Sequence, residues 1–397
     1  MRLALMSLAL LAMAGGSLPA QSRPRARDLG IAPGSMTPGP LNAITDVAGV
    51  LVGHTTVVRG DTVRTGVTAV LPHGRNLFKD KVPGAVFVGN AFGKLAGSAQ
   101  VQELGTIESP IVLTNTLSVG IALDAVVRWT MSQAGNENVR SVNALIGETN
   151  DAGLNDIRGL HVTREHVLAA VSGARPGAVD EGGVGAGTGT VAFGWKGGIG
   201  TSSRIVRQGP ETYTVGVLVQ SNYGGKLTIS GVPVWKDLTP HAPGDPMPGT
   251  PAVASIVPPP IARRTSDDAR RTSNADGSCM IVVATDAPLD ARDLGRLAAR
   301  AIFAMARTGS TYSNGSGDFA IAFSTHPALR VDGSPTPQTR MLLPTDSVSG
   351  LFEATLDATE EAIYNSMLKA DDTTSGGRTI RALPIPELRS VLAKYGR

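Results

Sequence analysis

The sequence predicts a mixed α and β fold in which helices cover sheets that are buried on both faces. Short runs rich in β-branched residues alternate with longer runs in which apolar residues recur at the helical spacing. Of the 397 residues, 42% are hydrophobic and 17% are charged, so the chain can bury a large core. The sequence shows no repeat at the period of a solenoid, which favours a layered, globular sandwich.

Six short segments have the composition of strands, and most lack the polar positions of a strand with a solvent-facing side. They are, in chain order, residues 50–52, 85–88, 111–114, 213–219, 280–285 and 319–324. Helices are predicted over residues 120–134, 290–307 and about 350–370. In the second of these helices, Leu294, Leu297 and Ile302 share one face. Gly309 is expected to end that helix.

The charge distribution argues against a nucleic-acid partner. The net charge is only +3 at neutral pH, and the charges are spread along the chain instead of forming a basic block. Aromatic residues make up 4% of the chain and glycines number 48, which indicates an aliphatic core with many close backbone approaches. The single cysteine, Cys279, permits no disulfide within the chain.

The first residues have the pattern of a secretory signal peptide. Arg2 precedes an apolar run over residues 3–14, and small residues lead to Ala20, which predicts cleavage before Gln21. An uncleaved membrane anchor is the alternative, but the run is short for a span and no second run of about 18 residues follows it. We therefore expect residues 1–20 to be removed, the protein to be periplasmic or secreted, and no stable membrane anchor to remain.

Residues 239–277 interrupt the alternation of strands and helices. The segment holds eight of the 26 prolines and contains the polar run ARRTSDDARRTSNAD, so it is predicted to be an exposed, mobile loop. An interdomain linker is the ordinary interpretation. However, residues 278–397 begin with a buried type of strand that needs partners from upstream. The alternative is therefore one domain built from residues 21–277 and 278–397 together.

The boundary between Gly277 and Ser278 fits a peptide bond that the chain cuts itself. A serine hydroxyl can attack the carbonyl of the preceding residue and convert the amide into an ester, which water then cleaves. Glycine at the preceding position has no Cβ to obstruct the attack. The released Ser278 would carry an α-amino group with an ordinary pKa of about 7.7–8.0, which suits a general base. A Gly-Ser pair before an apolar run is a common pattern, so other residues have to support this interpretation.

A resemblance carried by six segments is more specific than any single motif. The segments are LNAITDVAGVLVGHTT (41–56), GETNDAGLNDIRGLHV (147–162), GAGTGTVAFGWKGGIGTSSR (185–204), VGVLVQSNYG (215–224), GSCMIVVATDAPL (277–289) and ARTGSTYSNGSGDFAIAFST (306–325). Together they resemble the P1 family of peptidases, which comprises the DmpA-type aminopeptidases and the β-aminopeptidases. The segments occur in the family's order and cover most of the chain from about residue 27 to residue 325.

The resemblance implies an α+β fold, the αββα sandwich of the DmpA and ornithine acetyltransferase type, which is like that of N-terminal-nucleophile hydrolases. It implies an inactive precursor that cuts itself between Gly277 and Ser278 into an α chain, residues 21–277, and a β chain, residues 278–397. Ser278 would then attack small peptides, amides or esters that have a free amino terminus, through an acyl-enzyme. The family further implies a homo-oligomer of αβ heterodimers, and no cofactor is expected.

The resemblance also implies the residues around the nucleophile. Ser316 and Asp318 match a second serine and an acidic residue that position and polarise the amino group of the nucleophile. Asn222 matches an asparagine that helps to hold the oxyanion. Family members carry a tyrosine near the GET-ND stretch that also supports the oxyanion, whereas residues 147–157 contain none, and Asn150 is the predicted substitute. Without the resemblance, each of these four polar residues is typical of an ordinary turn.

Several other interpretations are open at this point. An acyltransferase like the ornithine acetyltransferases shares the architecture but uses an N-terminal threonine, and an exported, non-catalytic binding protein for peptides or amino acids would stay uncut. A penicillin-binding or β-lactamase site is disfavoured because its motifs would occur in reversed order. No metal is expected, since the six histidines include no H-E-x-x-H pattern.

Two features near the predicted site have structural interpretations. The glycine-rich run over residues 182–200 lacks the Gly-Lys-Ser/Thr ending of a phosphate loop, so it predicts close backbone approaches around the substrate cleft. Cys279 adjoins Ser278 but should point to the opposite face of the strand. We therefore expect a packed thiol there and not a second nucleophile.

Overall fold

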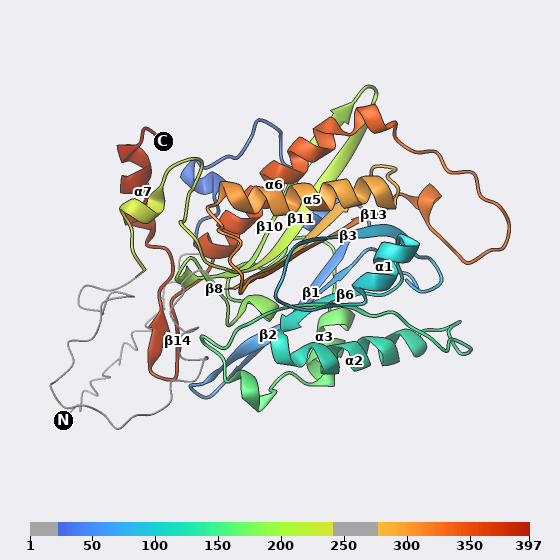
Figure 1. Cartoon of the computed structure of the whole chain (residues 1–397), viewed down its shortest axis with the longest axis horizontal. Coiled ribbons are helices and arrows are strands. Elements are labelled where there is room, and N and C mark those ends of the chain that lie inside the picture. The colour runs from blue at the N-terminus through green and yellow to red at the C-terminus, as the bar shows by residue number, and fades with distance from the viewer. Residues whose placement is uncertain (1–22, 241–276) are drawn as a thin grey trace, which may run out of the picture.

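The computed structural model describes residues 23–240 and 277–397. The predicted signal peptide and residues 241–276 of the predicted loop lie outside the described residues. Two sheets stack face to face, and helices cover the outer face of each sheet (Figure 1). The predicted αββα sandwich is therefore confirmed.

The larger sheet has six strands in the order β10-β11-β12-β13-β3-β5. Its strands are β3 (Val82–Ala91), β5 (Thr106–Ile107), β10 (Gly198–Gln208), β11 (Glu211–Asn222), β12 (Ser278–Thr285) and β13 (Gly317–Ser324). β12 runs antiparallel to β11 and parallel to β13. The strand that opens the downstream segment thus has an upstream partner, as its sequence predicts.

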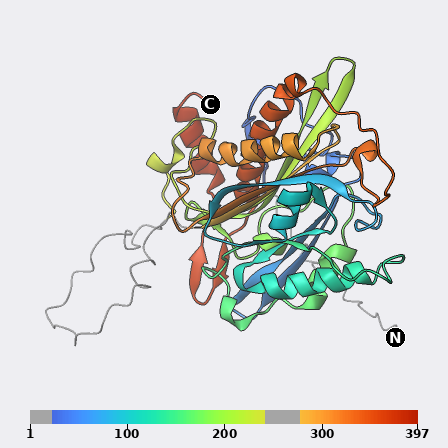
Figure 2. The same ribbon diagram turned by 45° about the vertical axis from the view of Figure 1, so that its right-hand side comes forward.

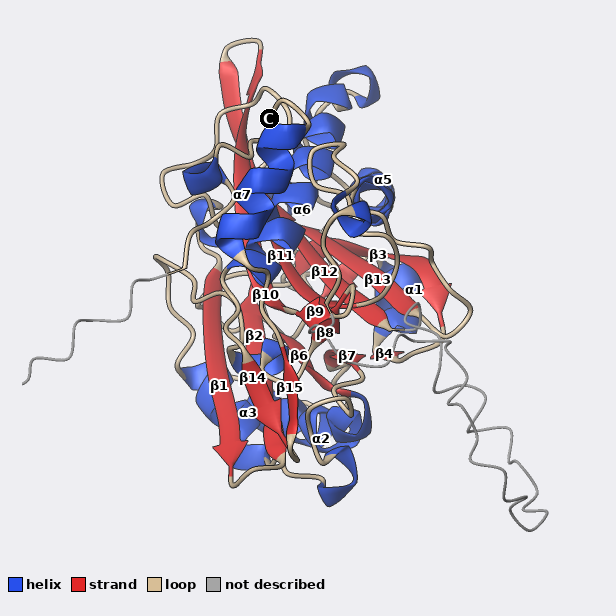
Figure 3. Ribbon diagram, turned by 90° about the vertical axis from the view of Figure 1, so that its left-hand side faces the viewer, coloured by secondary structure: helices blue, strands red, loops and turns tan. Residues whose placement is uncertain are grey.

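The smaller sheet has five strands in the order β1-β2-β6-β7-β4. Its strands are β1 (Leu51–Arg59), β2 (Val63–Leu71), β4 (Leu95–Ala96), β6 (Ile111–Asn115) and β7 (Leu145–Thr149). Two small hairpins complete the strands of the described residues, β8 (Val191–Ala192) with β9 (Trp195–Lys196) and β14 (Thr373–Ser375) with β15 (Arg378–Ile380). Figure 3 shows the strands of the two sheets one above the other, with β8 and β9 between them.

The helices form the two outer layers (Figure 2). α5 (Ala291–Arg307) and α6 (Ser349–Leu368) cover the six-stranded sheet, whereas α2 (Val119–Met131) and α3 (Arg164–Ser172) cover the five-stranded sheet. α1 (Ser98–Leu104) and α7 (Ile385–Lys394) are shorter. α5 begins where the sequence predicts, because the Asp290 carboxylate accepts a hydrogen bond of 3.0 Å from the Asp293 amide. Within the described ranges, no helix is long and apolar enough to cross a membrane.

Alternation along β12 divides the core into two layers. Met280 and Val282 point into the layer between the sheets, whereas Cys279 and Ile281 point toward α5 and α6. All four side chains are buried. Burial raises the pKa of the Cys279 thiol well above its ordinary value. The predicted packed thiol is therefore confirmed, and Ser278 lies on the face of β12 that looks toward the second sheet.

Candidate active site

Ser278 lies where three central strands of the larger sheet meet. It is the first residue of β12, and its register partners are Asn222 at the end of β11 and Gly317 at the start of β13. Ser316 and Asp318 flank that second partner along the chain. The structure therefore brings four of the predicted site residues to one edge of the sheet.

The peptide bond before Ser278 is held tightly by the neighbouring backbone. The carbonyl oxygen of Gly277 accepts a hydrogen bond of 3.1 Å from the Gly317 amide. A Cβ atom on Gly277 would lie 2.2 Å from the Asn222 carbonyl oxygen and 2.5 Å from the Cα atom of Tyr223, so only glycine fits without a shift. A backbone donor aimed at this carbonyl can stabilise the oxyanion that nucleophilic attack would create there.

Ser316 and Asp318 form a buried pair beside Ser278. The Ser316 hydroxyl donates a hydrogen bond of 2.9 Å to the Asp318 carboxylate, and Asp318 has no exposed surface. Burial raises the pKa of Asp318 to about 6, although hydrogen bonds from the Ser316 hydroxyl and the Cys279 amide oppose the shift. The pKa of this carboxyl group thus stays below the ordinary pKa of an N-terminal amine, which is about 7.7–8.0.

The side-chain amide of Asn222 is fixed at both ends. Its Oδ1 atom accepts a hydrogen bond of 2.9 Å from the Val191 amide, and its Nδ2 atom donates one of 3.0 Å to the Asn150 carbonyl. Because both contacts would be lost if the amide turned over, its orientation is determined by the backbone of two other segments. The second N–H of Nδ2 keeps a defined direction and can serve a further acceptor.

Asn150 contacts the site through its backbone. Its side chain is exposed, and its Oδ1 atom accepts a hydrogen bond of 3.0 Å from the Ala152 amide, as in a turn. Its carbonyl is the group that receives Asn222. The role in holding the oxyanion that the sequence predicts for the Asn150 side chain stays a prediction.

Sequence reasoning missed Glu148, a buried carboxylate at the end of β7. Its Oε1 atom accepts a hydrogen bond of 3.0 Å from the Lys94 amide, its Oε2 atom accepts one from the Thr116 hydroxyl, and the side chain is 2% exposed. A Cβ atom on Gly93 would lie 3.3 Å from Glu148 Oε1 and also 3.3 Å from the Cα atom of Gly317. The carboxylate is therefore beside the strand end that carries the site. The acid within the GETND motif is the signal that points to it.

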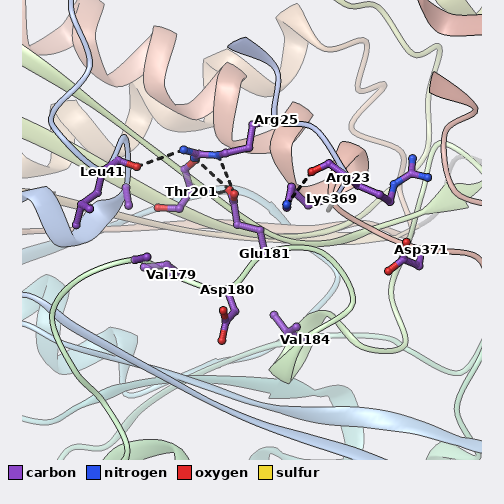
Figure 4. Close-up of a pocket in the computed structure, with 12 residues that line it drawn as sticks. Arg23, Arg25, Leu41, Val179, Asp180, Glu181, Val184, Thr201, Lys369 and Asp371 are labelled. Carbon is purple, nitrogen blue, oxygen red and sulfur yellow. Dashed lines mark hydrogen bonds and ion pairs between the residues drawn. The ribbon is translucent and has the colours of Figure 1, made fainter. Parts of the chain in front are cut away.

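A cavity of about 500 Å³ lies elsewhere, between the N-terminal segment, β10 and the end of α6 (Figure 4). Arg25 points toward Glu181, with 2.8 Å between the Nε and Oε2 atoms, and donates to the Thr201 carbonyl at 2.7 Å. Lys369 donates to the Arg23 carbonyl at 2.7 Å. The cavity contains none of the predicted site residues. Its basic groups hold the N-terminal segment against β10 and α6.

Charged side chains do not gather into a metal site in the part of the chain that the structure describes. Within residues 23–240 and 277–397, no group of three or more His, Cys, Asp or Glu side chains is placed to hold an ion. The chemistry available beside Ser278 is that of a hydroxyl, a buried carboxylate and fixed amide donors.

The whole arrangement matches a known family. A model of peptidase family S58 matches residues 42–380. The chain belongs to peptidase family S58. The S58 chain is 42% identical over 397 residues to the β-peptidyl aminopeptidase BapA of Sphingosinicella microcystinivorans, a match that covers 94% of this chain and 93% of that protein.

Solved structures agree with this assignment. A β-aminopeptidase of Burkholderia sp. has a TM-score of 0.80 and 36% identity, with 94% of the S58 chain and 99% of that chain covered. The L-aminopeptidase D-Ala-esterase/amidase of Ochrobactrum anthropi, described as a variant of the Ntn hydrolase fold, has a TM-score of 0.80, 34% identity and the same coverage. The S58 chain is thus a hydrolase, an aminopeptidase with an N-terminal nucleophile, as predicted. The acyltransferase and the binding protein find no support.

Proposed function

We propose that this S58 chain cuts itself between Gly277 and Ser278 and then removes N-terminal residues from small peptides, amides or esters. The observation that carries the proposal is the hydrogen bond of 3.1 Å from the Gly317 amide to the Gly277 carbonyl oxygen. It polarises the one peptide bond whose hydrolysis would place a serine at the start of a central strand.

The self-cleavage step uses groups that are already in place. The Ser278 hydroxyl oxygen attacks the Gly277 carbonyl carbon, and the negative charge that develops on the carbonyl oxygen faces the Gly317 amide. The C–N bond breaks, the Ser278 nitrogen takes the proton that the hydroxyl lost, and an ester links Gly277 to the Ser278 oxygen. Water hydrolyses this ester, leaving a carboxylate on Gly277 and a free α-amino group on Ser278.

Turnover repeats this chemistry on a substrate. The α-amino group of Ser278 takes the hydroxyl proton, the oxygen attacks the substrate carbonyl, and the proton passes to the leaving amine or alcohol. The free N–H of Asn222 supports the oxyanion, and Ser316 and Asp318 hold the α-amino group. Water then cleaves the acyl-enzyme by the same route, which regenerates the free serine.

The names of two relatives and the position of Glu148 support a proposal for the substrate class. Two curated relatives, 42% and 40% identical, are named β-peptidyl aminopeptidases. We therefore propose that β-amino acid residues are removed in preference to α-amino acid residues. The carboxylate of Glu148, buried beside Gly317, would face the ammonium group of such a substrate. A Glu148→Gln enzyme should lose most of its kcat/KM for β-alanyl p-nitroanilide. Equal kcat/KM values for β-alanyl and L-alanyl p-nitroanilide in the wild type would refute the preference.

The experiment that tests the proposed function is an intact-mass measurement on freshly purified protein, with N-terminal sequencing of every chain found. Two chains, one of them beginning at Ser278, are expected. A single uncut chain that still hydrolyses amides would remove the proposed nucleophile. The same data define the N-terminus of the upstream chain, and a start near Gln21 is expected for a periplasmic or secreted protein.

The assembly is a further part of the proposal. An oligomer of αβ heterodimers is expected, on the resemblance to DmpA-type enzymes. Light scattering of the cut protein should give a mass that is a multiple of one heterodimer. A mass equal to one heterodimer at micromolar concentration would contradict this part and leave the activity untouched.

A further inference from the structure

The β8–β9 hairpin has a tight two-residue turn. Val191 pairs with Lys196 and Ala192 pairs with Trp195, which leaves a two-residue turn. Phe193 and Gly194 occupy that turn with φ of 52° and 80°. Positive φ at both central residues defines the turn that matches the twist of a tight hairpin, although a phenylalanine seldom adopts it. The strained position indicates that contacts of the phenylalanine ring outweigh the backbone cost.

The β8–β9 hairpin contacts Asn222 and Tyr223. The Val191 amide donates to Asn222 Oδ1 at 2.9 Å, and the Phe193 amide donates to the Tyr223 carbonyl at 2.7 Å. The rings of Phe193 and Tyr223 pack edge to face, with 5.0 Å between their centroids. Three contacts therefore fix the hairpin to the strand end that carries Asn222.

Lys196, at the end of the hairpin away from the turn, links the two segments that flank the hairpin. Its ammonium group has no exposed surface and donates to the Gly187 carbonyl at 2.9 Å and to the Gly197 carbonyl at 2.7 Å. Its backbone amide donates to the Arg381 carbonyl at 2.7 Å. Burial lowers the pKa of Lys196 to about 7, against the opposing charge of Asp151. Because burying an amino group is costly unless it is hydrogen bonded, these two hydrogen bonds are what stabilises Lys196 inside the protein.

The second partner of Asn222 belongs to a different segment of the chain. Asp151 follows Asn150, whose carbonyl receives Asn222 Nδ2. The Asp151 carboxylate is buried and accepts a hydrogen bond of 3.0 Å from Asn155 Nδ2. The two hydrogen bonds that fix the Asn222 amide thus come from two segments, one anchored by a buried ammonium and one by a buried carboxylate.

We propose that Lys196 is a positioning residue that, through the β8–β9 hairpin, fixes the direction in which Asn222 presents its free N–H to the reacting carbonyl. Lys196 itself touches no substrate, since it has no exposed surface. It ties residues 187 and 197 together, so the Val191 amide stays in line with Asn222 Oδ1. Without that tie, the Asn222 amide can rotate and the oxyanion loses a preorganised donor. This inference rests on the oxyanion role proposed for Asn222.

A double-mutant cycle on the full chain tests it. We would measure kcat and KM of the wild type, Lys196→Met, Asn222→Ala and the double variant with β-alanyl p-nitroanilide, each normalised to the fraction of chains cut. Removal of an oxyanion donor lowers kcat by about 10²–10³-fold. Lys196→Met alone should lower kcat about tenfold with little change in KM, because part of that donor's effect is lost. In the Asn222→Ala background the same substitution should change kcat less than about twofold.

The control is Arg204→Met, which removes another fully buried cation, eight residues along the chain from Lys196 and near the middle of β10. Any change that it causes should have the same size in both backgrounds. An equal loss from Lys196→Met in both backgrounds, or no loss at all, would overturn the inference and leave the role of Asn222 intact. No loss in Asn222→Ala would instead remove the proposed role of Asn222. If Lys196→Met does not fold, Phe193→Ala takes its place in the cycle, since the Phe193 ring also holds the hairpin, through its contact with the Tyr223 ring.

Discussion

The Gly317 amide and the Gly277 carbonyl oxygen, 3.1 Å apart, form the first hydrogen bond between the strand that begins at Ser278 and its parallel neighbour. A β ladder would place a donor here in any case. In this chain the acceptor belongs to the bond that we propose is cut, so the sheet itself supplies the oxyanion donor. On the neighbouring strand β11, the backbone of Asn222 lies against Gly277. Rigid backbone, and not long side chains, therefore determines the geometry of the first reaction.

Replacing the nucleophile should stop self-cleavage. Ser278→Ala removes the attacking oxygen, so the purified protein should stay one chain over days and show no amidase activity. Mass spectrometry and a denaturing gel check this. Cys279→Ala is the matched control, because its buried thiol points to the opposite layer of the core, and this variant should be cut normally. A cut Ser278→Ala chain would show that another group attacks.

Glycine at position 277 should be required for cleavage. A Cβ there meets the Asn222 carbonyl oxygen at 2.2 Å, so Gly277→Ala has to displace the scissile carbonyl from the Gly317 amide. We expect self-cleavage at least tenfold slower, followed on gels after expression. Gly295→Ala is the control, since its nearest neighbour would lie 3.7 Å away and alanine favours its helix. Equal cleavage rates in the two variants would contradict the role given to the clash.

The sequence indicates some strands much better than others, for physical reasons. β12 and β13 are buried at every position, so continuous apolar runs identify them. β10 is not among the predicted strands, because its glycines, its serines and Arg204 lie buried in the sheet, where the polar side chains are hydrogen bonded. Arg204, for instance, pairs with Glu361 at 2.7 Å. The sequence analysis also does not predict the helices α1, α3 and α7, because they are short and α3 has a weak apolar pattern.

In the candidate site, too, the sequence predicts some features and not others. The sequence predicts Ser278, Ser316 and Asp318 as site residues only because they lie within segments that carry the family resemblance. The partners of Asn222 could not, since Val191 is 31 residues away and Asn150 is 72 residues away, and both contacts use backbone groups that any residue type supplies. Only the folded chain shows that these amides orient the side chain.

Activity should depend on two ionisations on the acid side. Asp318, whose pKa burial raises to about 6, has to be ionised to hold the α-amino group, and the α-amino group has to lose its proton at about pH 8 to act as a base. The logarithm of kcat/KM should therefore rise with unit slope between about pH 6 and about pH 8, and twice as steeply below. Steady-state kinetics over that range check this. Asp318→Asn should abolish the steep part as well as most of the activity, and a pH-independent rate in the wild type would refute both assignments.

Glu361 should hold the two proposed chains together after cleavage. It lies on α6, has no exposed surface and pairs with Arg204, which is equally buried, at 2.7 Å. Asn42 donates to it at 2.5 Å and Arg27 at 3.0 Å, so three residues that precede residue 277 converge on one carboxylate that follows it. Removing one member of a buried ion pair costs about 3–5 kcal/mol, because the other charge stays buried without a partner.

Glu361→Gln should therefore lower the free energy of unfolding by about 3–5 kcal/mol in the uncut Ser278→Ala background, where one chain unfolds and urea titration gives the value. In the cut protein, the same substitution should release the β chain at a lower urea concentration on size-exclusion chromatography. Glu353→Gln, an exposed position on the same helix, is the control and should leave both midpoints unchanged. If Glu361→Gln shifts the unfolding of the uncut protein but not the separation of the chains, Glu361 stabilises the fold without acting as the link between them.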